Sequence, residues 1–144
     1  MTPSIPAYPN LLRPGSPVLL SESYAATFGR SDGIVFDCGN EKAQVAYHED
    51  FRPALIPLVE LRLNLATDTG MCHAARWLAE RSGWHMRWVQ TAPPWERVMT
   101  EKGPVWKLSY GNSALYATDV PGIGDMTDPA AALAAACVAV GGAA

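Results

Sequence analysis

The sequence has few charged residues and no long hydrophobic run. Only 17% of its 144 residues are charged, and 11 Lys and Arg against 14 Asp and Glu give a formal net charge of −3. Proteins that bind nucleic acid through its phosphates are usually basic, so we do not expect nucleic-acid binding. The longest run without a charge, residues 129–144, is shorter than the ~20 residues of a membrane helix, so we expect no membrane partner.

Secretion signals and disulfide patterns are also missing. Residues 1–17 hold five prolines and one basic residue, and they lack the continuous apolar stretch of a secretory signal. The three cysteines, Cys38, Cys72 and Cys137, lie far apart, and an odd count without a pairing pattern is typical of a reducing compartment. These absences predict a cytoplasmic protein.

Motifs of catalysis and of cofactor or metal binding are absent as well. The chain has no HExxH, no CxxC, no phosphate-binding loop and no nucleophile elbow. His48, Glu49 and Asp50 are consecutive, but neighbouring strand residues point to opposite faces, which leaves too few ligands for a metal. Cys38 reads as a turn cysteine in preference to a nucleophile paired with His48. We therefore predict no catalytic residue, no metal and no cofactor, and we favour a protein that is not an enzyme.

What the sequence does contain is the pattern of an α+β protein. Residues 1–17 are predicted to form a Pro-rich extended arm, because each proline fixes φ and removes a backbone donor. Residues 18–144 are predicted to form a single α+β domain. Its clearest early element is a hairpin over residues 33–47, in which Gly39-Asn40 suits a type II′ turn between two runs of β-formers.

Two helices are predicted from capping residues and apolar periodicity. Thr67 and Asp68 begin one helix, whose apolar residues recur at helical spacing up to Ala79. Asp128 before Pro129 begins the other, which is apolar all round. We expect an antiparallel sheet with an N-terminal hairpin and the two helices packed on one face.

Residues 50–66 leave two interpretations open. A helix could start at Pro57, or a strand could follow Glu60 with leucines on one face and Arg62 and Asn64 on the other. We favour the strand, although the alternation of apolar and polar residues holds only briefly.

A resemblance covers roughly the second half of the chain. Residues 65–68, the amphipathic helix that follows, the Trp-rich strands and the closing Ala-rich helix of residues 127–137 resemble small phage-encoded proteins with an ABA-sandwich domain. The Pro-rich arm and the first hairpin depart from that pattern. The resemblance implies a phage or prophage accessory protein of the bacterial cytoplasm, which acts on a host protein or a phage assembly, and it carries over no functional residue.

The aromatic residues indicate where a partner would bind. Five tryptophans, at positions 77, 84, 88, 95 and 106, lie within thirty residues, and Trp95 follows two prolines in a predicted loop. Tryptophan and arginine are enriched at binding hot spots. The Asp119–Asp125 segment is a second predicted loop, and His73 shares a helix stripe with Trp77. The candidate interaction residues are Trp95, Arg97, Pro94, Trp77, His73, Asp119 and Asp125.

Three functions fit these observations. The first is a non-catalytic interaction protein, an inhibitor of host defence or an adaptor, with a homodimer through the uncharged C-terminal helix. The second is a small-molecule or nucleotide-binding protein, or a minor hydrolase, with a pocket lined by Trp and Tyr. The third is a component of virion assembly. We favour the first, because no acid–base pair or ligand cluster is visible in the sequence.

Overall fold

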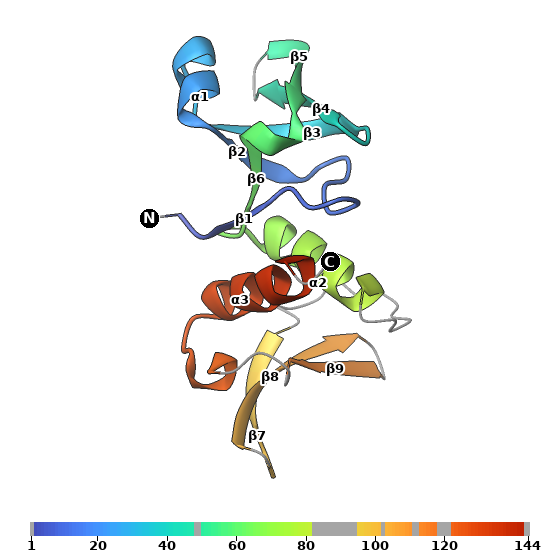
Figure 1. Ribbon diagram of the computed structural model, residues 1–144, viewed down its shortest axis with the longest axis vertical. Coiled ribbons are helices and arrows are strands. Elements are labelled where there is room, and N and C mark those ends of the chain that lie inside the picture. Colours follow the sequence, from blue (N-terminus) through green and yellow to red (C-terminus); the bar gives the residue numbers. More distant parts are fainter. Residues whose placement is uncertain are drawn as a thin grey trace. The chain divides into compact units, whose positions relative to one another are not determined.

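The computed structural model describes residues 2–47, 50–81, 95–101, 103–110, 113–117 and 122–142. Figure 1 shows the elements of the chain, which divides into two compact units, Met1–His73 and Ala74–Ala144. The predicted α+β class and the antiparallel pairing are confirmed, with the strands divided between a six-stranded and a three-stranded sheet. Within the described ranges, no helix is both long enough and apolar enough to cross a membrane.

The first unit is built on the six-stranded antiparallel sheet, in the strand order β1-β6-β2-β3-β4-β5. A short helix follows β2, and a single 3-10 turn joins β5 to β6. The elements are β1 (Ser4–Pro6), β2 (Pro17–Leu20), α1 (Glu22–Phe28), β3 (Asp32–Cys38), β4 (Lys42–Tyr47), β5 (Asp50–Pro57), η1 (Leu58–Glu60) and β6 (Leu61–Asn64).

A return connection completes this sheet. Strands β2 to β5 are neighbours in chain order, and η1 then leads the chain back so that β6 pairs with β2 on one side and β1 on the other. This is a connection of the Greek-key type. Residues 2–17 belong to the unit, since Ile5, Leu11 and Leu12 are buried in it. The two edges of the sheet are β1 and β5.

The core of the unit follows the predicted alternation. Ala43 and Val45 on β4 are fully buried, whereas Gln44 between them is only half-buried. Leu61 and Leu63 on β6 are buried around an exposed Arg62, which confirms the strand expected after Glu60. Each strand thus contributes one apolar face to the core.

The turn between β3 and β4 differs from the prediction. The Gly39 amide donates to the Lys42 carbonyl at 2.9 Å, so the loop residues are Asn40 and Glu41. Gly39 has no positive φ, which a type II′ turn centred on Gly39-Asn40 would need. The hairpin is confirmed, but its predicted turn type is wrong.

Helix α2 (Asp68–Arg81) begins at the predicted cap. The Thr67 Oγ1 accepts a hydrogen bond from the Gly70 amide at 3.0 Å, which satisfies one of the free donors of the first turn. Gly70 lies against the Asn64 carbonyl, where a Cβ atom would collide with backbone. The start of the helix is therefore held against the end of β6 by the absence of a side chain.

The second unit contains the three-stranded antiparallel sheet and the last helix. Its elements, besides the second half of α2, are β7 (Trp95–Thr100), β8 (Gly103–Tyr110), β9 (Ser113–Ala117), η2 (Ile123–Asp125) and α3 (Pro129–Gly142). In the sequence, two runs of β-formers on either side of Gly111-Asn112 predict a hairpin over residues 105–118, and the pairing of β8 with β9 confirms it. The alternation in residues 84–90 predicts a further strand, which lies outside the described residues.

The last helix also begins as predicted. The Asp128 Oδ1 accepts from the Ala130 amide at 3.1 Å, with Pro129 at the first helical position. Leu133 and Cys137 face the interior, and the Cys137 Sγ lies 3.8 Å from the Ala74 carbonyl oxygen of α2. Helix α3 and the second half of α2 therefore pack together within this unit.

Replacing Gly70 with alanine tests the contact at the start of α2. A glycine-to-alanine change inside a helix normally stabilises it by about 1 kcal/mol. At Gly70 we expect the opposite sign, a loss of about 2 kcal/mol in the free energy of unfolding, because the new Cβ meets the Asn64 backbone. Urea denaturation measures the difference. The exposed neighbour Thr69→Ala is the control, and a stabilised Gly70→Ala protein would contradict the packing described.

Candidate functional site

The outer face of the first sheet carries exposed apolar side chains. Phe36 is 64% exposed, Leu55 59% and Ile34 42%. Phe36 and Ile34 lie on β3 and Leu55 on β5, with β4 between these strands. Single exposed apolar residues are ordinary, but several on one face of three paired strands indicate a binding surface. We call Ile34, Phe36 and Leu55 the apolar row.

An irregularity in β3 determines which residues face outward. Val35 pairs with Val45 and Asp37 with Gln44, so Phe36 is an extra residue in the ladder between them. In such a bulge two residues oppose one on the partner strand, and a side chain is re-aimed. Phe36 and Asp37 are therefore both exposed opposite Gln44, and Gln44 in turn pairs with Leu55.

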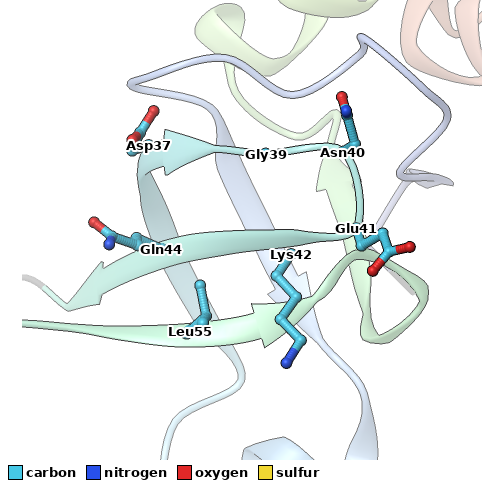
Figure 2. Close-up of a pocket in the computed structure, with 7 residues that line it drawn as sticks. All are labelled: Asp37, Gly39, Asn40, Glu41, Lys42, Gln44 and Leu55. Atoms are coloured by element: carbon cyan, nitrogen blue, oxygen red, sulfur yellow. The ribbon is translucent and has the colours of Figure 1, made fainter.

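A shallow hollow of about 510 Å³ lies at the hairpin end of this face. In Figure 2, Asp37, Gln44 and Leu55 stand at one end of it, and Asn40, Glu41 and Lys42 at the other. Two carboxylates, one ammonium group and two amides thus border an exposed leucine. Polar groups beside an exposed apolar side chain are typical of the rim of a protein interface.

The free edge of the sheet lies beside Leu55. Backbone groups of an antiparallel strand alternate between its two neighbours. The Leu58 amide donates to the Glu41 carbonyl at 2.9 Å, which makes that pair a hydrogen-bonded one. Counting back along the register, Ile56 and Ala54 also bond to β4, whereas the amide and carbonyl of Leu55 point away from it.

Two prolines flank this free amide. By the same alternation Pro57 also directs its backbone to the outer edge. Pro53 lies at the start of the irregular stretch of β5 between the pairs Val45–Ala54 and Tyr47–Asp50, and neither proline has an N–H to offer. Among the described residues no strand pairs with this side of β5. The edge therefore presents the donor and acceptor of Leu55 between two positions without a donor.

The structure gives the predicted contact residues different surroundings. Trp77 is only 1% exposed, and the Arg81 guanidinium lies over its indole ring, 5.5 Å from the ring centre. Trp77 is therefore a core residue and offers no contact surface. His73 is half-buried, and its Nδ1 lies 2.6 Å from the Ser16 Oγ, a bond that ties α2 to the segment before β2. Both residues have structural roles in the described chain.

Three of the remaining predicted residues are described, and they lie on β7 and η2 of the second unit. Trp95 was expected in a loop, but it is the first residue of β7 and pairs with Leu108. Arg97 on the same strand is exposed, and its Nε donates to the Gly124 carbonyl at 2.7 Å. Asp125 is exposed in η2. Pro94 and Asp119 lie outside the described residues. Arg97 thus lies two residues from Trp95 on β7, and its bond to Gly124 places it beside Asp125.

Reactive groups show no catalytic arrangement where they are described. Burial raises the pKa of Cys38, and the negative charge of the neighbouring Asp37 carboxylate raises it further. The thiol is therefore a poor nucleophile at neutral pH. Burial raises the pKa of Cys137 to about 12. Within the described ranges no group of three or more metal-ligating side chains occurs. His48, the possible partner of Cys38, lies outside them.

The apolar row was not predicted from the sequence, although the sequence of β3 contains one sign of it. In residues 33–38, Ile34 and Phe36 alternate with Val35, so both faces of this strand carry large apolar groups. Only one face of the strand can lie on the core of a single layer. The pattern alone could not say which face is exposed, because the bulge and the pairing partners decide that.

Comparisons of the chain with models of protein families, with curated proteins and with solved structures find no match.

The raised pKa of Cys38 predicts slow alkylation that accelerates with pH. Below the pKa, the thiolate fraction rises about tenfold for each pH unit, so labelling by iodoacetamide should still be increasing above pH 9. A Cys72→Ser variant isolates the signal, since Cys137 is fully buried. The same variant in urea gives the rate of an ordinary cysteine. A native rate that levels off below pH 8 would show an activated thiol instead.

Proposed function

We propose that the protein acts without catalysis, by binding another protein through the apolar row on the outer face of its first sheet. The observation that supports this is the exposure of Phe36 and Leu55 on one face of three paired strands, 64% and 59%. An aromatic residue surrounded by polar groups is the usual composition of a binding hot spot.

The energetics favour such a use of these side chains. Complete burial of a Phe or Leu side chain contributes about 1.5–3 kcal/mol, and most of that gain is unrealised while both are exposed. A partner that covers both, together with Ile34, recovers it. Around them Asp37, Lys42 and Gln44 supply polar groups that can orient the partner.

The partner we propose is a host or phage protein. The resemblance of residues 65–140 to phage-encoded proteins supports an accessory role in the bacterial cytoplasm, as an inhibitor of host defence or an adaptor. Self-association through α3 is part of this proposal, since that helix has no charged residue and its Val138 is 47% exposed.

A small-ligand function has one observation in its favour. The hollow of about 510 Å³ is within the usual size of ligand sites. Its lining, however, contains no Trp or Tyr, and only Leu55 contributes a large apolar surface. Ligand sites are mostly apolar and enclosed, so we rank this function second. A role in virion assembly would be a further use of the same apolar row.

Capture of the partner tests the proposal. The tagged chain is incubated with lysate of the bacterium that carries its gene, and Phe36→Ser and Leu55→Ser are compared with Val59→Ser. Val59 is 91% exposed on η1 and lines a different hollow of the surface, so it is a matched control. We expect wild type to capture one stoichiometric partner. Each test variant should capture about tenfold less of it, and the control should capture as much as wild type.

The stability of the variants separates binding from folding. All three changes are at exposed positions, so the free energy of unfolding should stay within about 0.5 kcal/mol of wild type. Equal capture by wild type, Phe36→Ser and Leu55→Ser would contradict the proposal. Sedimentation velocity of the same samples reports whether the chain self-associates.

A further inference from the structure

We infer that the partner binds by adding a short extended segment to the free edge of β5, centred on Leu55. This inference rests on the proposed function, because it specifies how the partner engages the apolar row. It concerns the backbone of β5, whereas the proposed function concerns the exposed side chains.

The backbone of Leu55 points away from β4. Its neighbours Ala54 and Ile56 form the hydrogen-bonded pairs with Val45 and Ala43. The Leu55 N–H and C=O therefore point to the outside of the sheet, where no described strand lies. An extended segment placed there gains two main-chain hydrogen bonds, which is the mechanism of β-strand addition.

The side chain of Leu55 also favours an added strand. Leu55 is 59% exposed on the outer face, in line with Gln44 and Phe36 across the neighbouring strands. In an added strand, the residue opposite Leu55 has its side chain on that face too, about 5 Å away. An apolar side chain there would extend the apolar row by one strand. The occupant therefore carries an apolar residue at its centre.

The two prolines define how long the added segment is. At Pro57, two residues after Leu55, the edge has a carbonyl but no donor; at Pro53, two residues before it, the regular register with β4 ends and the chain again has no donor. A segment can thus form its full pair of bonds only with Leu55, and it must leave the edge at the prolines. This favours a loop or tail of about three extended residues over a long strand.

The same prolines disfavour a second copy of this chain. If two β5 strands paired antiparallel about Leu55, Pro53 of one would face Pro57 of the other at the next hydrogen-bonding position on each side. Both prolines lack the donor, and their rings would occupy the space of the missing bonds. Proline at an edge is a known protection against self-pairing, so the edge selects a different chain.

Binding of selected peptides tests the inference. Linear twelve-residue peptides of random sequence, displayed as a library, are selected on the full chain, and the best binder is measured by fluorescence anisotropy. We expect Leu55→Ala to weaken it about threefold to tenfold and Leu55→Pro at least tenfold more. The proline removes an N–H that β4 does not use, whereas the alanine keeps it.

A second readout does not depend on the folding of a variant. Each residue of the selected peptide is N-methylated in turn, which removes one backbone donor. We expect one position to lose at least tenfold in affinity and both of its neighbours to be tolerated, since alternate residues face the edge.

The outcomes separate the inference from the proposed function. Uniform tolerance of N-methylation overturns strand addition, and so does an equal effect of Leu55→Ala and Leu55→Pro. If Phe36→Ser nevertheless abolishes binding of the peptide, the apolar row is a binding surface without strand addition. A library that yields no peptide sensitive to Leu55 also overturns the inference, because the prolines would then serve only to protect the edge.

Discussion

The first unit depends on the register of β4, which pairs with β3 on one side and with β5 on the other. Ala43 and Val45 direct their side chains into the core and their backbone to β5, while the Gln44 backbone faces β3. Because side chains and backbone groups both alternate with a period of two, this single register decides which residues are buried. It also decides that the amide of Leu55 faces the free edge. A slip of one residue would invert every one of these assignments.

Two departures from regularity turn this sheet into a candidate binding site. The extra residue at Phe36 places an aromatic ring and the Asp37 carboxylate on the same face. Between its two prolines, β5 offers a donor and an acceptor to the outer edge at Leu55 alone. Neither feature improves the packing of the core. The surface that results is partly apolar, short and unsuited to self-pairing, as an interaction with a different protein requires.

Local signals in the sequence predicted much of the fold. The hairpin over residues 33–47, the strand after Glu60 and the capped starts of α2 and α3 at Thr67 and Asp128 are all found in the structure. These features depend on neighbouring residues alone. The turn at Gly39 was predicted wrongly, because the loop is shifted one residue along the chain by the pairing of the strands it joins.

The candidate site was beyond the reach of local reasoning. That β5 is an edge follows from the return of β6 to a place between β1 and β2, which pairs residues some 40 to 60 positions apart. No periodicity records such a pairing. The cluster of tryptophans led to a predicted binding surface in the second half of the chain, but Trp77 is buried in the core. Residue type alone did not distinguish a packing aromatic from a presented one.

Amide hydrogen exchange resolved by residue in β5 tests the account most directly. The backbone direction of Leu55 predicts that its amide exchanges at nearly the rate of an unstructured chain, whereas the amides of Ala54 and Ile56 are protected by their bonds to β4. Equal protection of all three amides would contradict the free edge. Protection of Leu55 with rapid exchange of its two neighbours would show that the register itself is different.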